Sequence, residues 1–342
     1  MQWYYTWSVD AAMRLLQIAR TGERKVGKIE DGQIRLLDGI ASIYGLAQQV
    51  FEDGSRLAEA VERRLSREVL DYDGVYAGRS EWKIRPAMDQ PLEPARCLVS
   101  GTGLTHMVSA KNRQAMHETG QAPTDSMRMY QWGVEGGRPK AGEIGTAPEW
   151  FYKGCGTILR AHGEALEIPP HAEDGGEEPE IAGVYIIDPA GEPRRIGMAM
   201  GNEFSDHRFE KRNYLYLATS KLMTCAIGPE LVLDAEFAAV AGEVSIERGG
   251  KVIWQKPIAS GDAAMCHTLA NMEHHHFKHA GHRRPGDVHV HFFGADAFSF
   301  GEGVVLEDGD VMQVRFDGFG RALRNPLRID RSPQRLFAAQ PM

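Results

Sequence analysis

The hydrophobic positions of residues 13 to about 95 predict a small α/β unit. Apolar residues interrupted by glycines predict a short β-meander, and they are Leu15, Ile18, Val26, Ile29, Ile34 and Leu36. Ser42 then precedes an apolar run that is typical of a capped helix. A second helical run extends from Ser55 to about Leu70, because apolar residues recur there at helical spacing, namely Leu57, Ala60, Val61 and Leu65.

The rest of the chain shows short strands separated by glycine and proline turns. Two strands joined by a turn are predicted at Glu180–Asp188 and Arg195–Met200, and a hairpin closed by two glycines joins Val244–Glu247 to Val252–Trp254. Three prolines, at positions 86, 91 and 94, mark an extended linker. We therefore expect an α+β protein with a small N-terminal domain over residues 1–95 and a larger domain over 96–342. Residues 1–12 precede the regular pattern and are interpreted as an extension.

Composition narrows the class of partner. The 342 residues include 39 basic and 47 acidic side chains, a net charge of −8, which argues against nucleic acid. No apolar run approaches the roughly 18–20 residues of a membrane span, and no secretory signal is visible. The four cysteines are scattered without metal-binding spacing. We therefore expect a cytoplasmic protein with reduced thiols and no membrane partner.

Carboxylates provide the strongest chemical signal. Glu178 and Glu180 open a predicted strand, and Glu203 follows in the segment Gly-Asn-Glu-Phe-Ser. Residues i and i+2 of a strand share a face, so the first two carboxylates lie about 6–7 Å apart along the backbone. Such a pair repels unless a cation lies between its members, and a hard divalent metal fits best. Taken alone, the spacing also fits two solvated glutamates on an exposed face.

The surrounding motifs resemble the fumarylacetoacetate hydrolase superfamily. The chain carries, in the superfamily's order, an E-x-E strand, a G-N-E-x-S segment where the superfamily has G-N-D-x-S, and Lys221 before a Gly-Pro turn. Phe151-Tyr152-Lys153 resembles an upstream F-L-K strand, and two late segments resemble the closing strands, Leu306–Val311 and Gly320–Asn325. The resemblance covers roughly residues 95–330 and implies a mixed β-sandwich roll as the catalytic domain.

Departures from the superfamily pattern point to one branch. Glu203 replaces the usual aspartate, Ser109 replaces the histidine with which C–C hydrolases activate water, and Ala295 replaces the threonine of a late loop that begins at Gly294. Residues 124–133 resemble the GguC-like branch found among sugar-acid utilisation proteins. The related activity there is dehydration of 2-keto-3-deoxy sugar acids.

The resemblance implies a site and an activity. Glu178, Glu180 and Glu203 would hold Mg²⁺ or Mn²⁺, and Lys221 would be catalytic, although an exposed lysine is the default for its type. His106 and Ser109 are further catalytic candidates, and the expected contacts to a small 2-keto acid substrate are Lys153, Arg128, Gly294 and Ala295. The expected reaction is dehydration of a 2-keto-3-deoxypentonate to 2,5-dioxopentanoate by a homodimer.

Two other functions compete with this interpretation. The first is a hydrolase that cleaves a carbon–carbon bond of a 2,4-diketo-3-deoxy sugar acid or an acylpyruvate, and the loss of histidine at position 109 argues against it. A hydroxyl alone is a poor base at neutral pH. The second is a non-catalytic sugar-acid-binding protein, against which the presence of Lys221 and all three carboxylates argues.

Histidines gather late in the chain, at positions 267, 274, 275, 276, 279, 282, 289 and 291. Zinc binding is the sharper interpretation, since imidazole is a common zinc ligand. The consecutive histidines 274–276 cannot all face one ion on a regular element, however. We therefore expect structural roles for this cluster or roles in supporting the site, and one of its histidines could still transfer a proton to or from the substrate.

Overall fold

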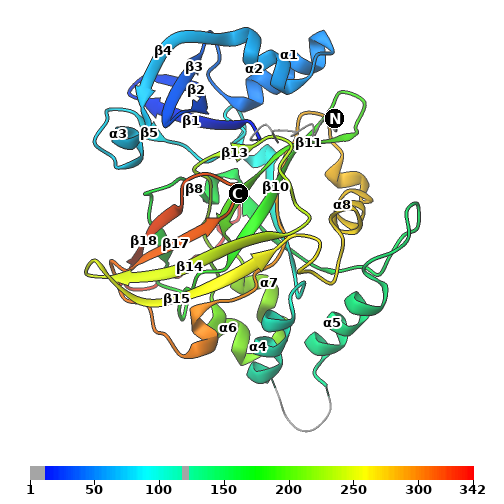
Figure 1. The fold of residues 1–342 in the computed structure, drawn as a ribbon. Helices are drawn as coiled ribbons and strands as arrows, with labels where there is room; N and C mark the ends of the chain where they lie inside the picture. The colour runs from blue at the N-terminus through cyan, green and yellow to red at the C-terminus, as the bar shows by residue number, and fades with distance from the viewer. Residues whose placement is uncertain (1–11, 118–122) are drawn as a thin grey trace, which may run out of the picture.

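The structure, a computed structural model, describes residues 12–117 and 123–342. Within these residues, strands form a 13-stranded and a 5-stranded sheet, with helices at the ends and flanks (Figure 1). Mixed sheets accompanied by helices confirm the expected α+β class. Most of the predicted N-terminal extension, residues 1–11, lies outside the described residues. Among the described residues, none of the helices combines the length and apolarity needed to cross a bilayer.

The N-terminal unit begins with the predicted meander. Its antiparallel strands are β1 (Arg14–Arg20), β2 (Glu23–Glu30) and β3 (Gln33–Leu37). The predicted capped helix is also confirmed, as α1 (Ile43–Asp53), because the Ser42 hydroxyl accepts a hydrogen bond from the backbone N–H of Gly45 at 3.0 Å. The short elements that complete the unit are α3 (Tyr72–Tyr76) and β5 (Lys83–Ile84).

The second predicted helix is shorter than expected. Helix α2 (Leu57–Arg64) ends where strand β4 (Leu65–Asp71) begins, and β4 pairs antiparallel with β3. Ala60 and Val61 of α2 are buried, so the helical spacing was interpreted correctly up to that point. Beyond it, the open edge of β3 offers backbone hydrogen bonds that a sequence pattern does not reveal.

The larger sheet continues from this unit into the rest of the chain. Strand β1 pairs with β13, and the sheet then runs on to β7 in the order β13-β11-β10-β16-β6-β7. The domain boundary near residue 95 stays a prediction. The bounds are β6 (Cys97–Gly103), β7 (Glu149–Cys155), β8 (Leu159–Arg160), β10 (Pro179–Ile187), β11 (Pro193–Asn202), β12 (Cys225–Ile227), β13 (Leu231–Val232) and β16 (Val288–Phe292).

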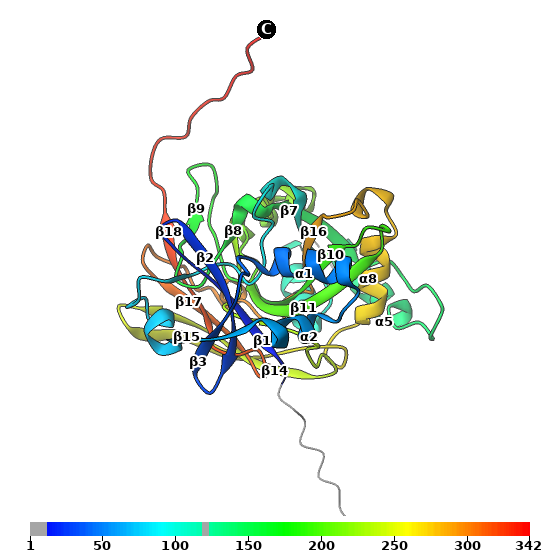
Figure 2. The same cartoon turned by 90° about the horizontal axis from the view of Figure 1, so that it is seen from above.

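The predicted strand pair around residue 190 is confirmed as β10 and β11. All residues of β10 are buried, because β11 and β16 flank it while the second sheet and helix α1 cover its faces. From above, α1 and α2 lie over β10 and β11 (Figure 2), where Leu46 and Val61 share one apolar cluster with Val184 and Ile186. The central strand is therefore held rigidly from both sides.

The smaller sheet crosses the front of Figure 1 and packs on the larger one. It contains, in spatial order, β15 (Lys251–Ser260), β14 (Val240–Arg248), β17 (Val311–Phe316), β18 (Leu323–Ile329) and β9 (Leu166–Ile168). The predicted hairpin is confirmed as β14 and β15, with both linking glycines at positive φ. Ile181 and Met200 of the larger sheet meet Val244 and Val314 of the smaller one.

Helices gather at the end of the sandwich opposite the N-terminal unit (Figure 1). They are α4 (Met107–His117), α5 (Asp125–Gly136), α6 (His207–Arg212) and α7 (Leu217–Ser220), while α8 (Leu269–Phe277) lies on the flank. The single-turn 3₁₀ helices are η1 (Pro94–Arg96), η2 (Gly156–Ile158), η3 (Tyr214–Tyr216), η4 (Ala280–His282) and η5 (Ser299–Glu302).

Three histidines of the late cluster are buried between α8 and β16, His276 on the helix and His289 and His291 on the strand. The indole N–H of Trp150 donates to Nδ1 of His276 at 3.1 Å, so His276 carries its proton on Nε2 when neutral and donates it to Nδ1 of His289 at 2.9 Å. His291 is held between the hydroxyls of Ser100 and Thr102 at 2.8 and 2.7 Å. Among the described residues, these imidazoles do not converge as a metal-ligand set, which supports the structural interpretation.

This cluster should make the fold sensitive to acid. Burial lowers the pKa of both His289 and His291 to about 3 from the ordinary 6.5. The folded state then binds fewer protons than the unfolded state between about pH 6.5 and 3. The free energy of unfolding should be highest above pH 6.5 and fall with the pH by up to about 1.4 kcal/mol per unit for each histidine.

Urea unfolding from pH 7 to 4.5 measures this slope. His289→Phe should flatten it, whereas His274→Gln, on the exposed side of α8, should leave it unchanged. If His289→Phe left the slope unaltered, His289 would not contribute to the pH dependence of stability.

Candidate functional site

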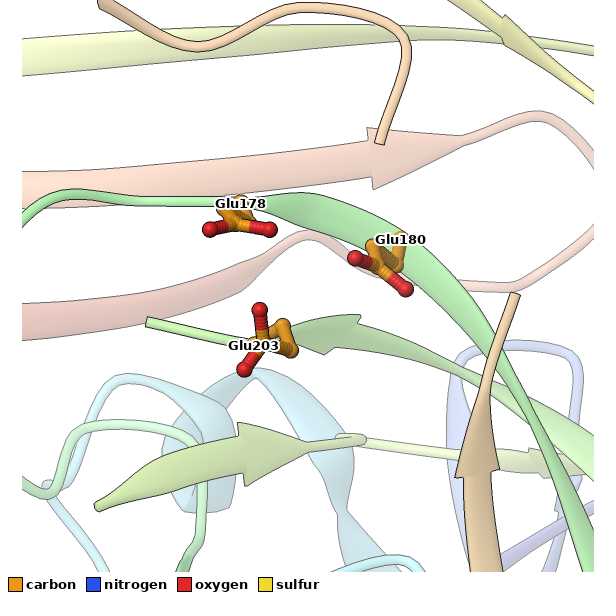
Figure 3. Close-up of side chains that lie close together, drawn as sticks. All are labelled: Glu178, Glu180 and Glu203. Atoms are coloured by element: carbon orange, nitrogen blue, oxygen red, sulfur yellow. The ribbon is translucent and has the colours of Figure 1, made fainter. Parts of the chain in front are cut away.

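Three buried carboxylates meet where β10 begins and β11 ends. The antiparallel register pairs Glu180 with Gly201, which brings Glu203, just beyond β11, beside Glu178. The backbone N–H of Glu203 donates to the Glu178 carbonyl at 2.9 Å. One carboxylate oxygen from each glutamate lies within 4.8 Å of the others, and the side chains point toward one another (Figure 3). The glutamates are therefore not the solvated surface residues that their spacing alone also allowed.

Two buried lysines neutralise part of this charge. Nζ of Lys221, which follows α7, lies 2.6 Å from Oε1 of Glu178 and 2.5 Å from Oε2 of Glu203. Nζ of Lys153, on β7, lies 2.6 Å from Oε1 of Glu203 and donates to the backbone carbonyls of Phe204 and Lys221. Both lysines are about 1% exposed, so neither is a surface residue.

The charges at the site do not balance. Burial opposes ionisation of Glu178, but the Lys221 ammonium and the imidazole of His207 together hold its pKa well below the usual range. Burial and the neighbouring charges of Glu203 and Glu178 raise the pKa of Glu180 well above it. Burial and the charge of Glu178 also raise the pKa of Glu203, against the effect of Lys153 and Lys221. Carboxylate charge is therefore in excess around Glu180.

This arrangement fits a hard divalent cation. Mg²⁺ and Mn²⁺ prefer oxygen ligands, and carboxylates are their usual protein donors. Glu180 accepts a hydrogen bond from the Gly294 N–H at 2.6 Å, and the charge of Lys221 only partly offsets the effects that raise its pKa. A cation between the three carboxylates would offset the repulsion that raises its pKa. The three carboxylates therefore suit Mg²⁺ or Mn²⁺ in both charge and donor type.

A narrow pocket of about 20 Å³, with room for about one water molecule, opens on Glu178 and Glu180. Its walls include the predicted residues Ser109, Lys221, Gly294 and Ala295. The Ser109 hydroxyl donates to the His106 carbonyl at 3.0 Å. Gly294 has φ 99°, and a Cβ there would lie 2.0 Å from Oγ1 of Thr105, so both backbone angle and space require glycine.

The structure does not bring the remaining candidates to this pocket. The His106 ring is buried and is not among the lining residues; its Nδ1 shares a hydrogen bond of 2.9 Å with the Thr105 hydroxyl, and burial lowers its pKa to about 4. Arg128 lies on the exposed side of α5 and pairs with Asp125 at 3.3 Å. Lys153 is also not among the residues that line the pocket, although it forms an ion pair with Glu203.

Sequence reasoning missed five lining residues, Gly103, Leu104, His207, Glu210 and Phe298. A signal for His207 and Glu210 was present, because the polar run Ser205-Asp206-His207 begins two residues after Glu203. The Asp206 carboxylate accepts from the Phe209 N–H at 2.9 Å and so caps α6. That cap begins the helix at His207 and turns the residues after the third carboxylate back toward the site. Phe298 carried no comparable signal.

Comparison with known proteins places the fold. No family model matches the chain, and no curated protein matches it either. Among solved structures, 2-keto-3-deoxyarabinonate dehydratase is 20% identical with a TM-score of 0.70, covering 94% of this chain and 100% of its own. The same enzyme complexed with magnesium and 2,5-dioxopentanoate has 20% identity, the same coverage and a TM-score of 0.68.

An isomerase shows the same architecture. The 5-carboxymethyl-2-hydroxymuconate delta-isomerase from Mycobacterium smegmatis is 16% identical with a TM-score of 0.56, covering 93% of this chain and 100% of its own. At these identities the likeness concerns the fold alone. The chain therefore has a fold that it shares, over nearly its whole length, with a dehydratase and an isomerase.

Proposed function

We propose that the protein is a metal-dependent hydro-lyase of the fumarylacetoacetate hydrolase superfamily, of its GguC-like branch. It would dehydrate a 2-keto-3-deoxy sugar acid, for example a 2-keto-3-deoxypentonate to 2,5-dioxopentanoate. The observation that carries the proposal is the buried set of three carboxylates, two of which pair with Lys221. The magnesium and 2,5-dioxopentanoate held by a dehydratase of the same fold support it by analogy. The superfamily resemblance further suggests a cytoplasmic homodimer.

Glu178, Glu180 and Glu203 are the residues that would hold Mg²⁺ or Mn²⁺. When bound, such an ion supplies Lewis-acid stabilisation of negative charge on a 2-keto acid, which makes the C3 protons more acidic. The chain contributes a dry and rigid setting for this chemistry, since all three glutamates are less than 10% exposed. Electrostatic interactions are stronger there than in bulk water.

Lys221 would stabilise the charge that develops on the substrate when a C3 proton leaves. Its ammonium already contacts two of the three carboxylates and lines the pocket, so it lies beside any substrate oxygen that enters there. Lys153 keeps Glu203 and the backbone of Lys221 in place from the opposite side. Ser109 faces the pocket with a hydroxyl that can bind a hydroxyl of the substrate.

The overall change is the loss of one water molecule. A proton leaves C3, the C4 hydroxyl departs with a proton, and a carbon–carbon double bond forms between C3 and C4. For a pentonate, tautomerisation of this unsaturated acid gives 2,5-dioxopentanoate. No carbon–carbon bond breaks, and the position that houses the water-activating histidine of hydrolases holds Ser109 instead.

Mg²⁺ should stabilise the protein through the three carboxylates. Binding at 100 times the dissociation constant adds about 2.7 kcal/mol to the free energy of unfolding. Glu180→Gln removes charge from a carboxyl whose pKa is raised. Because a raised carboxyl pKa means that ionisation above about pH 4.5 destabilises the folded state, the metal-free variant should be at least as stable as wild type at pH 7.5.

Thermal unfolding with chelator and with added Mg²⁺ measures both effects. The variant should lose most of the Mg²⁺-dependent rise in Tm, whereas Glu143→Gln, at an exposed glutamate, should keep it. Chelation should abolish turnover, and Mg²⁺ should restore it. A full Mg²⁺ response in Glu180→Gln would argue against this metal site.

Lys221→Ala should reduce kcat by about 10²-fold or more, the usual loss when a group that stabilises transition-state charge is removed. Steady-state kinetics with Mg²⁺ at saturation separate this effect from any change in metal affinity. Lys251→Ala, at an exposed lysine, is the control. A kcat close to that of wild type would show that the lysine is merely structural.

A panel of 2-keto-3-deoxy acids, 2,4-diketo acids and acylpyruvates, followed by mass spectrometry, separates dehydration from hydrolysis. Wild type should remove one water from a 2-keto-3-deoxypentonate and act slowly on acylpyruvates. Ser109→Ala should cost no more than one hydrogen bond, about 0.5–1.5 kcal/mol, and so be milder than Lys221→Ala. Efficient release of pyruvate from an acylpyruvate would assign a C–C hydrolase, and absence of turnover across the panel would favour a binding protein.

A further inference from the structure

His207, the first residue of α6, holds the carboxylate of Glu178 in one orientation. Its Nε2 lies 2.9 Å from Oε1 of Glu178, the same oxygen that receives Nζ of Lys221 at 2.6 Å. A carboxylate oxygen only accepts hydrogen bonds, so Nε2 carries the proton. Two donors on one oxygen oppose rotation of the carboxylate about its last side-chain bond. The orientation of Oε2 is thereby set as well.

Two aromatic rings hold the imidazole itself. Phe298 stacks on His207 with a centroid distance of 5.0 Å and an interplanar angle of 15°, and Phe300 lies 5.1 Å away at 34°. The imidazole is nearly fully buried. Stacking of this kind restrains the plane of the ring without contributing a charge of its own.

Gly176 provides the space for the edge of the imidazole. A Cβ at this position would lie 2.6 Å from Nδ1 and 2.8 Å from Cε1 of His207. The backbone of Gly176 exchanges hydrogen bonds of 3.0 and 3.1 Å with Ser205, so the glycine cannot simply move away. Its φ is not positive, and the requirement for glycine here is one of space.

Glu177 links the segment of Phe298 and Phe300 to the residues that lead into β10. This buried carboxylate accepts hydrogen bonds from the backbone N–H of Ser299 at 2.6 Å and from its hydroxyl at 2.9 Å. Ser299 lies between Phe298 and Phe300 in the sequence, and Glu177 immediately precedes Glu178. The two phenylalanine rings that contact His207 and the Glu178 carboxylate that it binds are therefore connected through Glu177 and Ser299.

From this geometry we propose that His207 is a positioning residue for the metal site, held by Phe298, Phe300 and Gly176 and fastened through the pair Glu177–Ser299. The proposal rests on the proposed function, in which Glu178 is a metal ligand. A carboxylate fixed before the ion arrives loses less conformational freedom on binding than one that is free to rotate. Loss of such a supporting hydrogen bond typically weakens metal binding 10–100-fold.

Titration calorimetry of the full-length protein with Mg²⁺, in the absence of substrate, tests this role. His207→Phe keeps a ring but removes the donor, and it should weaken Mg²⁺ binding 10–100-fold. His207→Gln places an N–H donor near the position of Nε2 and should remain within a few-fold of wild type. His171→Gln, at an exposed histidine, should bind like wild type.

A second variant leaves the donor and the carboxylate chemically intact. Gly176→Ala displaces the imidazole and should also weaken Mg²⁺ binding, which keeps the test valid if His207→Phe fails to fold. Wild-type affinity in both His207→Phe and Gly176→Ala would overturn the positioning role alone. Absence of Mg²⁺ binding by wild type would overturn the proposed metal site and this role together.

Discussion

Repulsion between three buried carboxylates is the constraint around which the site is organised. The antiparallel pairing of β10 and β11 forces Glu178, Glu180 and Glu203 together, because their backbones are hydrogen-bonded neighbours in a central part of the sheet. Burial makes that proximity costly. Lys221, Lys153, His207 and the Gly294 N–H each offset part of the cost, and the pKa of Glu180 nevertheless stays well above its usual range.

The rigidity of the sandwich makes this crowding possible. Strand β10 is buried along its whole length, with a neighbouring strand on each side and an apolar cluster on each face. A mobile strand would let the carboxylates separate and take up water. Lys153 adds to the restraint, since its ammonium binds two backbone carbonyls besides Glu203 and so joins β7 to the segments that follow β11 and α7.

Local sequence patterns predicted local structure correctly. They failed where contacts between segments far apart in the sequence determine the structure. The i, i+2 spacing of Glu178 and Glu180 was sufficient to predict a shared face, and a serine before an apolar run was sufficient to place α1. The strand β4 was missed because its partner β3 lies about thirty residues earlier. Phe298 reaches the pocket through hydrogen bonds between Ser299 and Glu177, which are 122 positions apart and form no motif. Arg128 was expected to contact the substrate; it lies exposed on α5 and pairs with Asp125, and that contact stays a prediction.

The division of labour between strands and loops has an evolutionary consequence. The three carboxylates come from one strand pair, whereas the other pocket walls come from separate segments: Ser109 from α4, Gly294 and Ala295 from the loop after β16, and Phe298 from the segment before η5. Loops tolerate substitution and insertion far better than a central strand does. Lineages with this scaffold can therefore vary the pocket walls in peripheral segments while the strand pair keeps its carboxylates together.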